Sequence, residues 1–388
     1  MRLDVRPVES AEALELYVSA APDPGRDVAV DAHDMFAAAA AVVKAHGARV
    51  CRERVFVPAG RLKAFREAHA AAFPPSAEPV PSDWLWAGAD GALGGLQLYA
   101  IRGAQDWKPL RVGETVAGYT FRQNGHRWAI TGALDLPHNP DGARETSEAF
   151  ARGEAVLSQA GMDLSCVART WFFLDDILSW YGNFNNVRNR LFIDRGLLRR
   201  GQKASEAQVP ASTGMGVAPA GGGRVALELF AVSGPKGSVK RYAASGKQRS
   251  AYEYGSAFAR ASEAQTPAGR TVFVSGTAAI DEAGATCFVD DAKGQIRMTI
   301  DNLLAVLRDT SCSPRHVVQA IAYCKTKEIA EYFQDEWIPE VPWPWVVVIG
   351  DVCRPDLLFE AELTACEPGG TSEPEVPAEV EGCEAVAS

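Results

Sequence analysis

The amino-acid sequence predicts an α+β protein in which two related sheet-plus-helix units are fused in one chain. One observation behind this prediction is that the same order of strands and helices occurs twice. A second is that the helical segments are amphipathic, while the strand segments are short and rich in Val, Ile and aromatic residues. The length of 388 residues also exceeds what one hydrophobic core usually supports, which favours two packed units.

Each copy of the repeat has the order strand, helix, strand, helix, strand. The first copy comprises RWAITGALDL (127–136), SEAFARGEAVLSQAGM (147–162), VARTWFFL (167–174), DDILSWYGNFNNVRNRLFIDRG (175–196) and GRVALELFAV (223–232). The second comprises TVFVSGTAAID (271–281), QIRMTIDNLLAVLRDT (295–310), VVQAIAYC (317–324), EIAEYFQDEWI (328–338) and DLLFEAELTA (356–365). A sheet whose helices all lie on one face is the layer design that this order favours. We expect the two sheets to pack against each other.

These copies predict a division of the chain into 1–240, 241–366 and 367–388. Residues 1–115 match neither copy, although VCRERVFVPAG (50–60) and GLQLYAI (95–101) are typical of strands, so we assign them to the N-terminal half. Residues 367–388 are rich in Pro, Glu and Gly and hold almost no large apolar side chains, which predicts a disordered acidic tail.

Composition excludes several classes of function. The formal net charge of −10 disfavours nucleic-acid binding, and the absence of an apolar run of membrane-spanning length disfavours a membrane protein. The N-terminus lacks the apolar stretch of a secretion signal. The eight cysteines are isolated in sequence, which predicts no zinc site or disulfide framework and favours a cytoplasmic protein. The oligomeric state stays open between a monomer and a small homo-oligomer.

Two motifs of the second copy resemble the RidA (YjgF/UK114) fold family, whose units are chorismate-mutase-like. They are SGTA (275–278) and, after two helices, the closing strand RPDLLFEAEL (354–363). The resemblance implies ligand clefts between sheets. RidA deaminases also place an arginine four residues before the Asp position of this strand. Val352 stands there in this chain, which argues against imine deamination.

A sharper resemblance is to the chorismatases, a family with a RidA-like fold. It is carried, in the family's order, by WYGNFNNVRNRLF (180–192), PASTGMG (210–216), AYEYGSAFARA (251–261), VSGTAAI (274–280) and GDVCRPDLLFEAEL (350–363). The resemblance implies a catalytic glutamate at Glu360 and a residue that tunes the product at Cys353. The branch that forms 3-hydroxybenzoate and pyruvate resembles this sequence in having cysteine there. A diol product, 3,4-dihydroxycyclohexa-1,5-dienoate, or a mixture of 3- and 4-hydroxybenzoate remains an alternative.

Cleavage of the enolpyruvyl ether of chorismate needs no cofactor, but it needs a proton on the terminal methylene carbon. The acid must therefore be neutral at working pH and directed at that carbon. A glutamate flanked by Leu358 and Phe359 in an apolar strand could have the raised pKa that this requires. Cys353 could act by excluding water, by donating a hydrogen bond or as a base.

The two carboxylates of chorismate call for arginines and hydrogen-bond donors. The resemblance implies substrate binding by Tyr181, Arg188, Tyr254 and Arg260, with small residues Ala278 and Ala279 leaving room for the ring. Tyr181 and Arg188 are seven residues apart on one predicted helix, so both can face one cleft.

We expect one active site per chain, built mainly by the second copy. Superposing VALELF on LLFEAE places Glu228 opposite Glu360, but a glycine-rich turn precedes Glu228 instead of CRPD. A RidA-like imine deaminase or a non-catalytic ligand-binding protein is the alternative of another class. A pterin-dependent oxygenase is disfavoured because the six histidines do not have the spacing of an iron site.

Overall fold

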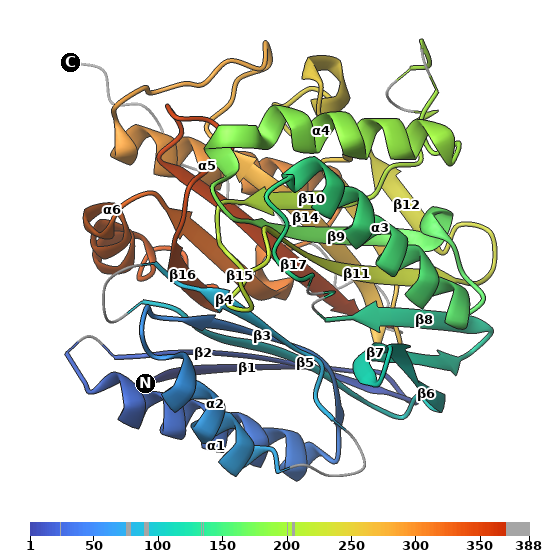
Figure 1. The fold of residues 1–388 in the computed structure, drawn as a ribbon, viewed down its shortest axis with the longest axis vertical. Helices are drawn as coiled ribbons and strands as arrows, with labels where there is room; N and C mark the ends of the chain where they lie inside the picture. The colour runs from blue at the N-terminus through green and yellow to red at the C-terminus, as the bar shows by residue number, and fades with distance from the viewer. Residues whose placement is uncertain are drawn as a thin grey trace, which may run out of the picture.

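The computed structural model describes residues 1–23, 25–74, 79–88, 93–132, 134, 136–199, 201–203 and 206–369, except the side chain of Tyr254. The strands of these ranges form three sheets, and each sheet carries two helices on its outer face (Figure 1). The α+β class and the fused sheet-plus-helix units are therefore confirmed. Nearly all of the predicted tail, residues 370–388, lies outside the described ranges. Within these ranges, no helix is both long and apolar enough to span a membrane.

The first unit is built by the N-terminal region, which matched neither copy of the sequence repeat. Its elements are β1 (Arg2–Glu9), β2 (Leu14–Ala21), α1 (Val28–His46), β3 (Arg49–Val57), α2 (Leu62–Ala72), β4 (Ser82–Trp86) and β5 (Gly95–Arg102). Its strand order is β1-β2-β5-β3-β4. Strand β3 carries three consecutive charged residues, Arg52, Glu53 and Arg54, and all three are buried. These charges break the apolar pattern of a core strand, so the sequence did not reveal a third unit.

The second and third units contain the two copies of the repeat. The second has β6 (Gln105–Val112), β7 (Thr115–Gln123), β8 (His126–Thr131), α3 (Gly142–Gln159), β9 (Val167–Leu174), α4 (Ile177–Asp194), β10 (Ala211–Met215) and β11 (Val225–Ser233). The third has β12 (Val239–Tyr242), β13 (Ala261–Gln265), β14 (Gly269–Ala278), α5 (Ala292–Asp309), β15 (Val317–Cys324), α6 (Lys327–Tyr332), β16 (Trp345–Ile349) and β17 (Phe359–Pro368). The strand order is β6-β7-β8-β11-β9-β10 in the second unit and β12-β13-β14-β17-β15-β16 in the third. Both repeat the order of the first unit, with one extra edge strand each.

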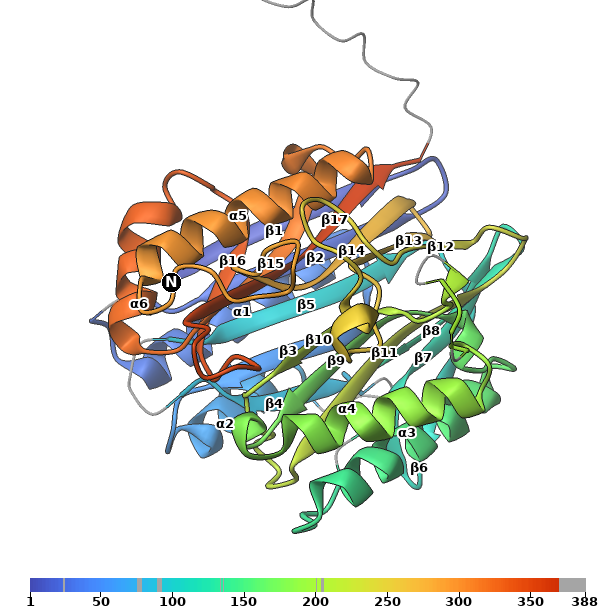
Figure 2. The same cartoon turned by 90° about the horizontal axis from the view of Figure 1, so that it is seen from above.

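The inner faces of the three sheets share one hydrophobic core. Phe56 of the first unit, Phe173 and Phe230 of the second, and Phe273 and Ile321 of the third all belong to it. The outer face of each sheet packs on its own helices in a separate core. Figure 2 shows the resulting arrangement, with the helices at the periphery and the sheets facing inward. The clefts between units are therefore bounded by the sheet of one unit and a helix of the next.

A buried cluster of charges lies where the three sheets meet. Arg54 donates to Glu228 with an Nε–Oε1 distance of 2.7 Å, and Arg169 donates to Glu362 at 2.5 Å. The guanidinium groups of both arginines lie 4.8 Å from the ring centroid of Trp171. The two carboxylates come from equivalent positions of β11 and β17. The cluster thus ties all three units together.

Removing one partner of this cluster is predicted to destabilise the protein. Arg169→Met leaves Glu362 buried without its main cation, which costs about 3–5 kcal/mol for a buried pair. The melting temperature should fall, and the double variant Arg169→Met/Glu362→Gln should recover part of the loss because no uncompensated charge remains. An unchanged melting temperature in Arg169→Met would contradict a structural role for the pair.

Strand register corrects the sequence superposition of the two copies. Glu228 pairs with Trp171, the fifth residue of β9, and Glu362 pairs with Ile321, the fifth residue of β15. Glu228 is thus the counterpart of Glu362, and placing it opposite Glu360 was wrong by two residues. Both counterparts lie in the central charge cluster.

The counterparts of Glu360 itself are small residues. Glu360 pairs with the seventh residue of β15, and Ala226 pairs with the seventh residue of β9. In the first unit the same register position is Gly95. Among the closing strands of the three sheets, only β17 carries an acid at this position.

Candidate active site

A cavity of about 330 Å³ lies between the second and third units. Helix α4 and strand β10 form its wall on one side, and β14, β17 and the loops before them form the other. Its lining residues are Tyr181, Gly182, Asn185, Asn186, Arg188, Ser212, Gly214, Gly255, Ser256, Phe258, Arg260, Gly276, Ala278, Ile280, Cys353, Arg354 and Glu360. The units are joined beside it by hydrogen bonds, including Ser212 N–H to Ser275 Oγ at 2.8 Å.

Glu360 is the second residue of β17 and lies at the floor of this cavity. Its side chain is only 6% exposed. Burial, together with the neighbouring charge of Glu362, raises the pKa of Glu360 to about 8, although Arg260, Arg169 and Arg354 act in the opposite direction. A carboxyl group with such a pKa is mostly protonated at neutral pH and can donate a proton to a bound molecule.

Gly276 makes room for the Glu360 carboxyl. A Cβ atom added at Gly276 would collide with Glu360 Oε1 and would lie 3.2 Å from Thr213 Cγ2. The Gly276 N–H donates to Thr213 Oγ1 at 2.9 Å, and the Thr213 hydroxyl in turn donates to Glu362. The backbone under Glu360 is therefore held by the central charge cluster.

Tyr181 and Cys353 face each other across the cavity. Both side chains pack against the hydrophobic core of the second unit, and Ser256 lines the cavity with them. Burial and the nearby Glu360 raise the pKa of the Cys353 thiol to about 12, with Arg354 opposing the shift. Burial also raises the pKa of Tyr181. Both groups are neutral at physiological pH, so the thiol is suited to hydrogen bonding and packing, not to acting as a base.

Three arginines, Arg188, Arg260 and Arg354, supply positive charge around the cavity. Arg188, 1% exposed, donates to Asn185 Oδ1 at 2.6 Å. Arg260 is also buried and donates to the Arg249 carbonyl at 3.1 Å. Arg188 and Arg260 lie 5.5 and 5.4 Å from the ring centroid of Phe258, so this ring holds both guanidinium groups at the wall. Their charge can offset the repulsion of an anion by an acidic protein.

The other sequence-predicted residues divide between the cavity and its surroundings. Ala278 lines the cavity next to Glu360 in the sheet. Ala279 is fully buried and is not among the lining residues. The side chain of Tyr254 lies outside the described structure, although the next two residues, Gly255 and Ser256, line the cavity.

Sequence reasoning missed Arg354, Ser212 and the asparagines of α4. Arg354 donates to the Gly284 carbonyl at 2.9 Å and lines the cavity one residue after Cys353. It stands inside the CRPD segment, and a search for cations near Cys353 would have found it. Asn185 and Asn186 lie four and five residues after Tyr181, about one helical turn further along α4.

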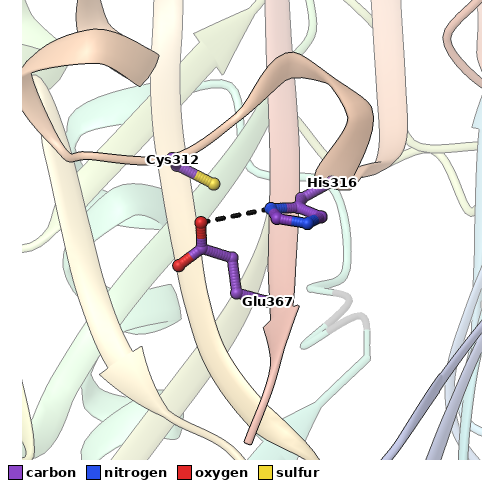
Figure 3. A group of neighbouring side chains, drawn as sticks. All are labelled: Cys312, His316 and Glu367. Atoms are coloured by element: carbon purple, nitrogen blue, oxygen red, sulfur yellow. Dashed lines mark hydrogen bonds and ion pairs between the residues drawn. The ribbon is translucent and has the colours of Figure 1, made fainter. Parts of the chain in front are cut away.

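Cys312, His316 and Glu367 form a separate group at the far end of β17 (Figure 3). Their possible ligand atoms lie within 4.8 Å of one another, and His316 Nδ1 lies 3.1 Å from Glu367 Oε1. Arg270 already donates to Glu367 Oε2 through its Nε at 2.9 Å. Burial and the neighbouring Glu367 raise the pKa of the Cys312 thiol to about 12, against the opposing effect of Arg270, which disfavours the thiolate form that a metal ion would need. We therefore assign this group no part in the candidate active site.

Comparisons with known proteins agree with this architecture. The model of the Endoribonuclease L-PSP family matches residues 255–367. A crystal structure of a chorismatase is similar over 94% of this chain and 98% of its own, with a TM-score of 0.59 and 17% identity. Yeast Mmf1 is similar over 33% of this chain and 98% of its own, with 13% identity and a TM-score of 0.27. The protein YjgH is similar over 33% of this chain and 97% of its own, with 24% identity and a TM-score of 0.27. No curated protein sequence matches. The chain therefore has the fold of the chorismatase structure, with a RidA-like unit at its C-terminal end.

Proposed function

We propose that this protein is a chorismatase that cleaves chorismate to 3-hydroxybenzoate and pyruvate without a cofactor. The observation that supports this most strongly is a buried carboxyl group, Glu360, whose pKa of about 8 leaves it protonated at neutral pH in a cavity lined by arginines. Cleavage of an enol ether by carbon protonation needs such an acid. The similarity of fold to a chorismatase supports the same reaction class.

In the proposed first step, Glu360 donates its proton to the terminal methylene carbon of the enolpyruvyl group. The resulting oxocarbenium ion is stabilised by the carboxylate that remains. The substrate's two carboxylates bind Arg188, Arg260 and Arg354, whose fixed positions orient the methylene toward Glu360. Ala278 and Gly276 leave space for the ring.

In the second step, the hydroxyl of the ring attacks the neighbouring carbon and pyruvate leaves. The arene oxide formed in this way keeps the hydroxyl proton on its oxygen and opens, and that proton becomes the phenol proton. The ring carbon then loses a proton that restores Glu360 to its acid form. The products together contain the atoms of chorismate, so the reaction consumes no water. Cys353 and Tyr181, whose pKa values burial raises, line the cavity as neutral groups that favour exclusion of water from this step.

The direct test is incubation of the metal-stripped protein with chorismate, followed by chromatography of the products and an assay of pyruvate. Equal amounts of pyruvate and 3-hydroxybenzoate support the proposal. Pyruvate with a cyclohexadiene diol, or with 4-hydroxybenzoate as well, supports another chorismatase branch. If chorismate stays intact while 2-iminopropanoate is hydrolysed, the protein is a RidA-like deaminase and the proposal is wrong.

Replacing the thiol is predicted to change the product more than the rate. Cys353→Ala removes the thiol from the cavity wall and opens space for water beside Glu360. We expect pyruvate release within about tenfold of the wild-type rate, because the acid is retained, with a larger share of the diol among the products. Cys353→Ser, which keeps a hydrogen-bonding group, should form less diol than Cys353→Ala. An unchanged product ratio in both variants would contradict a role for Cys353 in excluding water.

A further inference from the structure

A second cavity, of about 530 Å³, lies between the first and second units. Its lining residues are Arg66, His69, Val80, Pro81, Ser82, Trp84, Val112, Thr115, Val116, Ala117, Leu134 and Arg152. They come from α2 and β4 on one side and from β6, β7, α3 and the segment after β8 on the other. None of them lines the candidate active site.

Strand register shows that β4, which forms one wall of this cavity, is the counterpart of β10 in the candidate active site. Ser212 of β10 lies beside Thr170 of β9, and the two hydroxyl groups are hydrogen-bonded at 2.9 Å. In the first unit Ser82 of β4 lies beside Glu53 of β3, and its hydroxyl donates to Glu53 Oε2 at 2.5 Å. Two residues further along each short strand, the active site has Gly214 and the second cavity has Trp84.

At the third interface, between the third and first units, apolar residues stand at the corresponding positions. Trp345 and Val347 of β16 occupy the positions of Ser212 and Gly214, and both are buried. Val347 also forms a backbone bridge with Gly94 of the first unit. Apolar side chains therefore fill this interface, whereas the second cavity stays open and includes polar side chains such as Ser82 and His69 in its lining.

The second cavity lacks the proposed catalytic acid but keeps positive charge. The position equivalent to Glu360 on the closing strand is Ala226. The lining contains two arginines and one histidine and, among the described residues, no acid. His69 is fixed by a contact of 2.8 Å between its Nε2 and Glu53 Oε2. In a protein of net charge −10, a basic lining of this kind favours an anionic ligand.

The remaining lining is apolar and includes an aromatic face. Val112, Val116, Ala117 and Leu134 form one wall, and Trp84 lies opposite with the Arg66 guanidinium 5.7 Å from its ring centroid. An apolar wall, an aromatic ring and a basic rim together suit a planar, amphipathic anion. We propose that this cavity binds a monocyclic aromatic carboxylate without transforming it.

The test uses 4-bromobenzoate as the probe, because its bromine can be located by anomalous scattering. Crystals of the full chain soaked with the probe should show bromine in the second cavity as well as in the candidate active site. The charge-reversed variant Arg66→Glu/Arg152→Glu should lose the bromine peak of the second cavity and keep the other. Arg190→Glu, which changes an exposed arginine of α4 remote from the second cavity, is the control and should keep both peaks.

Calorimetric titration then checks that binding depends on charge. Benzoate should bind the wild-type protein at two sites, and the charge-reversed variant should bind it at least about tenfold more weakly at one of them, as expected for the loss of charge-assisted bonds. Benzamide, the neutral isostere of benzoate, should bind the second cavity of the wild-type protein at least about tenfold more weakly than benzoate does. Equal binding of benzamide and benzoate at this site, or bromine in the active site alone, would overturn the proposal. Neither readout depends on turnover of chorismate, so a failure here is distinguishable from a failure of the proposed function.

Discussion

Glu360→Gln is expected to reduce cleavage of chorismate by roughly 10³-fold, within the range for loss of a positioned general acid. Glutamine has nearly the same shape and can fill the same space beside Gly276, but it cannot donate a proton to carbon. Binding of substrate should persist, because the arginines of the cavity are unchanged. Initial rates of pyruvate release, measured beside a binding assay with unreacted chorismate, separate the two effects.

Glu331→Gln provides the matched control, since Glu331 lies on α6 with its side chain 57% exposed. It should retain the wild-type rate. A Glu360→Gln variant that cleaves chorismate at more than about a tenth of the wild-type rate would show that another group supplies the proton.

The same carboxyl group predicts the pH dependence of activity. Because the acid form is the active one, the rate at saturating chorismate should fall as the pH rises through about 8, the pKa of Glu360.

The stability of the folded protein should follow the same titration of Glu360. The folded pKa lies above the ordinary value of 4.5, so between pH 4.5 and about 8 the folded state holds a proton that the unfolded state has released. Stability contributed by this group is therefore complete below pH 4.5 and lost as the pH rises to about 8. Glu360→Gln should melt a few degrees higher than the wild type at pH 8 and show no such gain at pH 4.5.

Gly276→Ala is expected to abolish most activity while leaving the fold intact. The added methyl group would occupy the place of Glu360 Oε1, so the carboxyl must rotate away from its position in the cavity. A displacement of about an ångström at the reacting group can cost about 100-fold in rate. Pyruvate release should therefore fall by about 100-fold, and circular dichroism should show an unchanged secondary structure.

Gly182→Ala is the control for this substitution. Gly182 also lines the cavity, but a Cβ atom added there would meet nothing within 4 Å. It should keep activity within a few-fold of the wild type, and as an alanine within α4 it should not lower the melting temperature. If Gly276→Ala retains full activity, the carboxyl of Glu360 does not need the position that the structure gives it.

Sequence pattern predicted much of the two later units, and the resemblance to the chorismatases implied several of the residues that line the cavity. The apolar periodicity of α5 and the alternation of short strands follow from local chemistry, and they predicted five elements of each copy in their order. They missed β10 and β16, which precede the closing strands. Of the eight predicted site residues, Tyr181, Arg188, Arg260, Ala278, Cys353 and Glu360 line one cavity. Their roles in catalysis and binding remain predictions.

The first unit shows why pattern alone was insufficient for the whole chain. Strand β3 buries Arg54 and Arg52, which a sequence-based reading treats as surface residues. Their burial is possible because Glu228 comes from a different sheet to pair with them. A long-range pair of this kind leaves no local signal in the sequence.

The sequence by itself determined which elements form and where the chemically active side chains stand along the chain, because both depend on local residue types and spacing. Tertiary structure alone decided the state of those side chains. Burial between the second and third units raises the pKa of Glu360 to about 8, and Gly276 leaves its carboxyl group room. Likewise, only the packing of the units decided which interfaces stay open, since Val347 closes one and Ser82 leaves its counterpart polar. These properties depend on distances between residues far apart in the chain, and such distances are fixed only when the units have packed together.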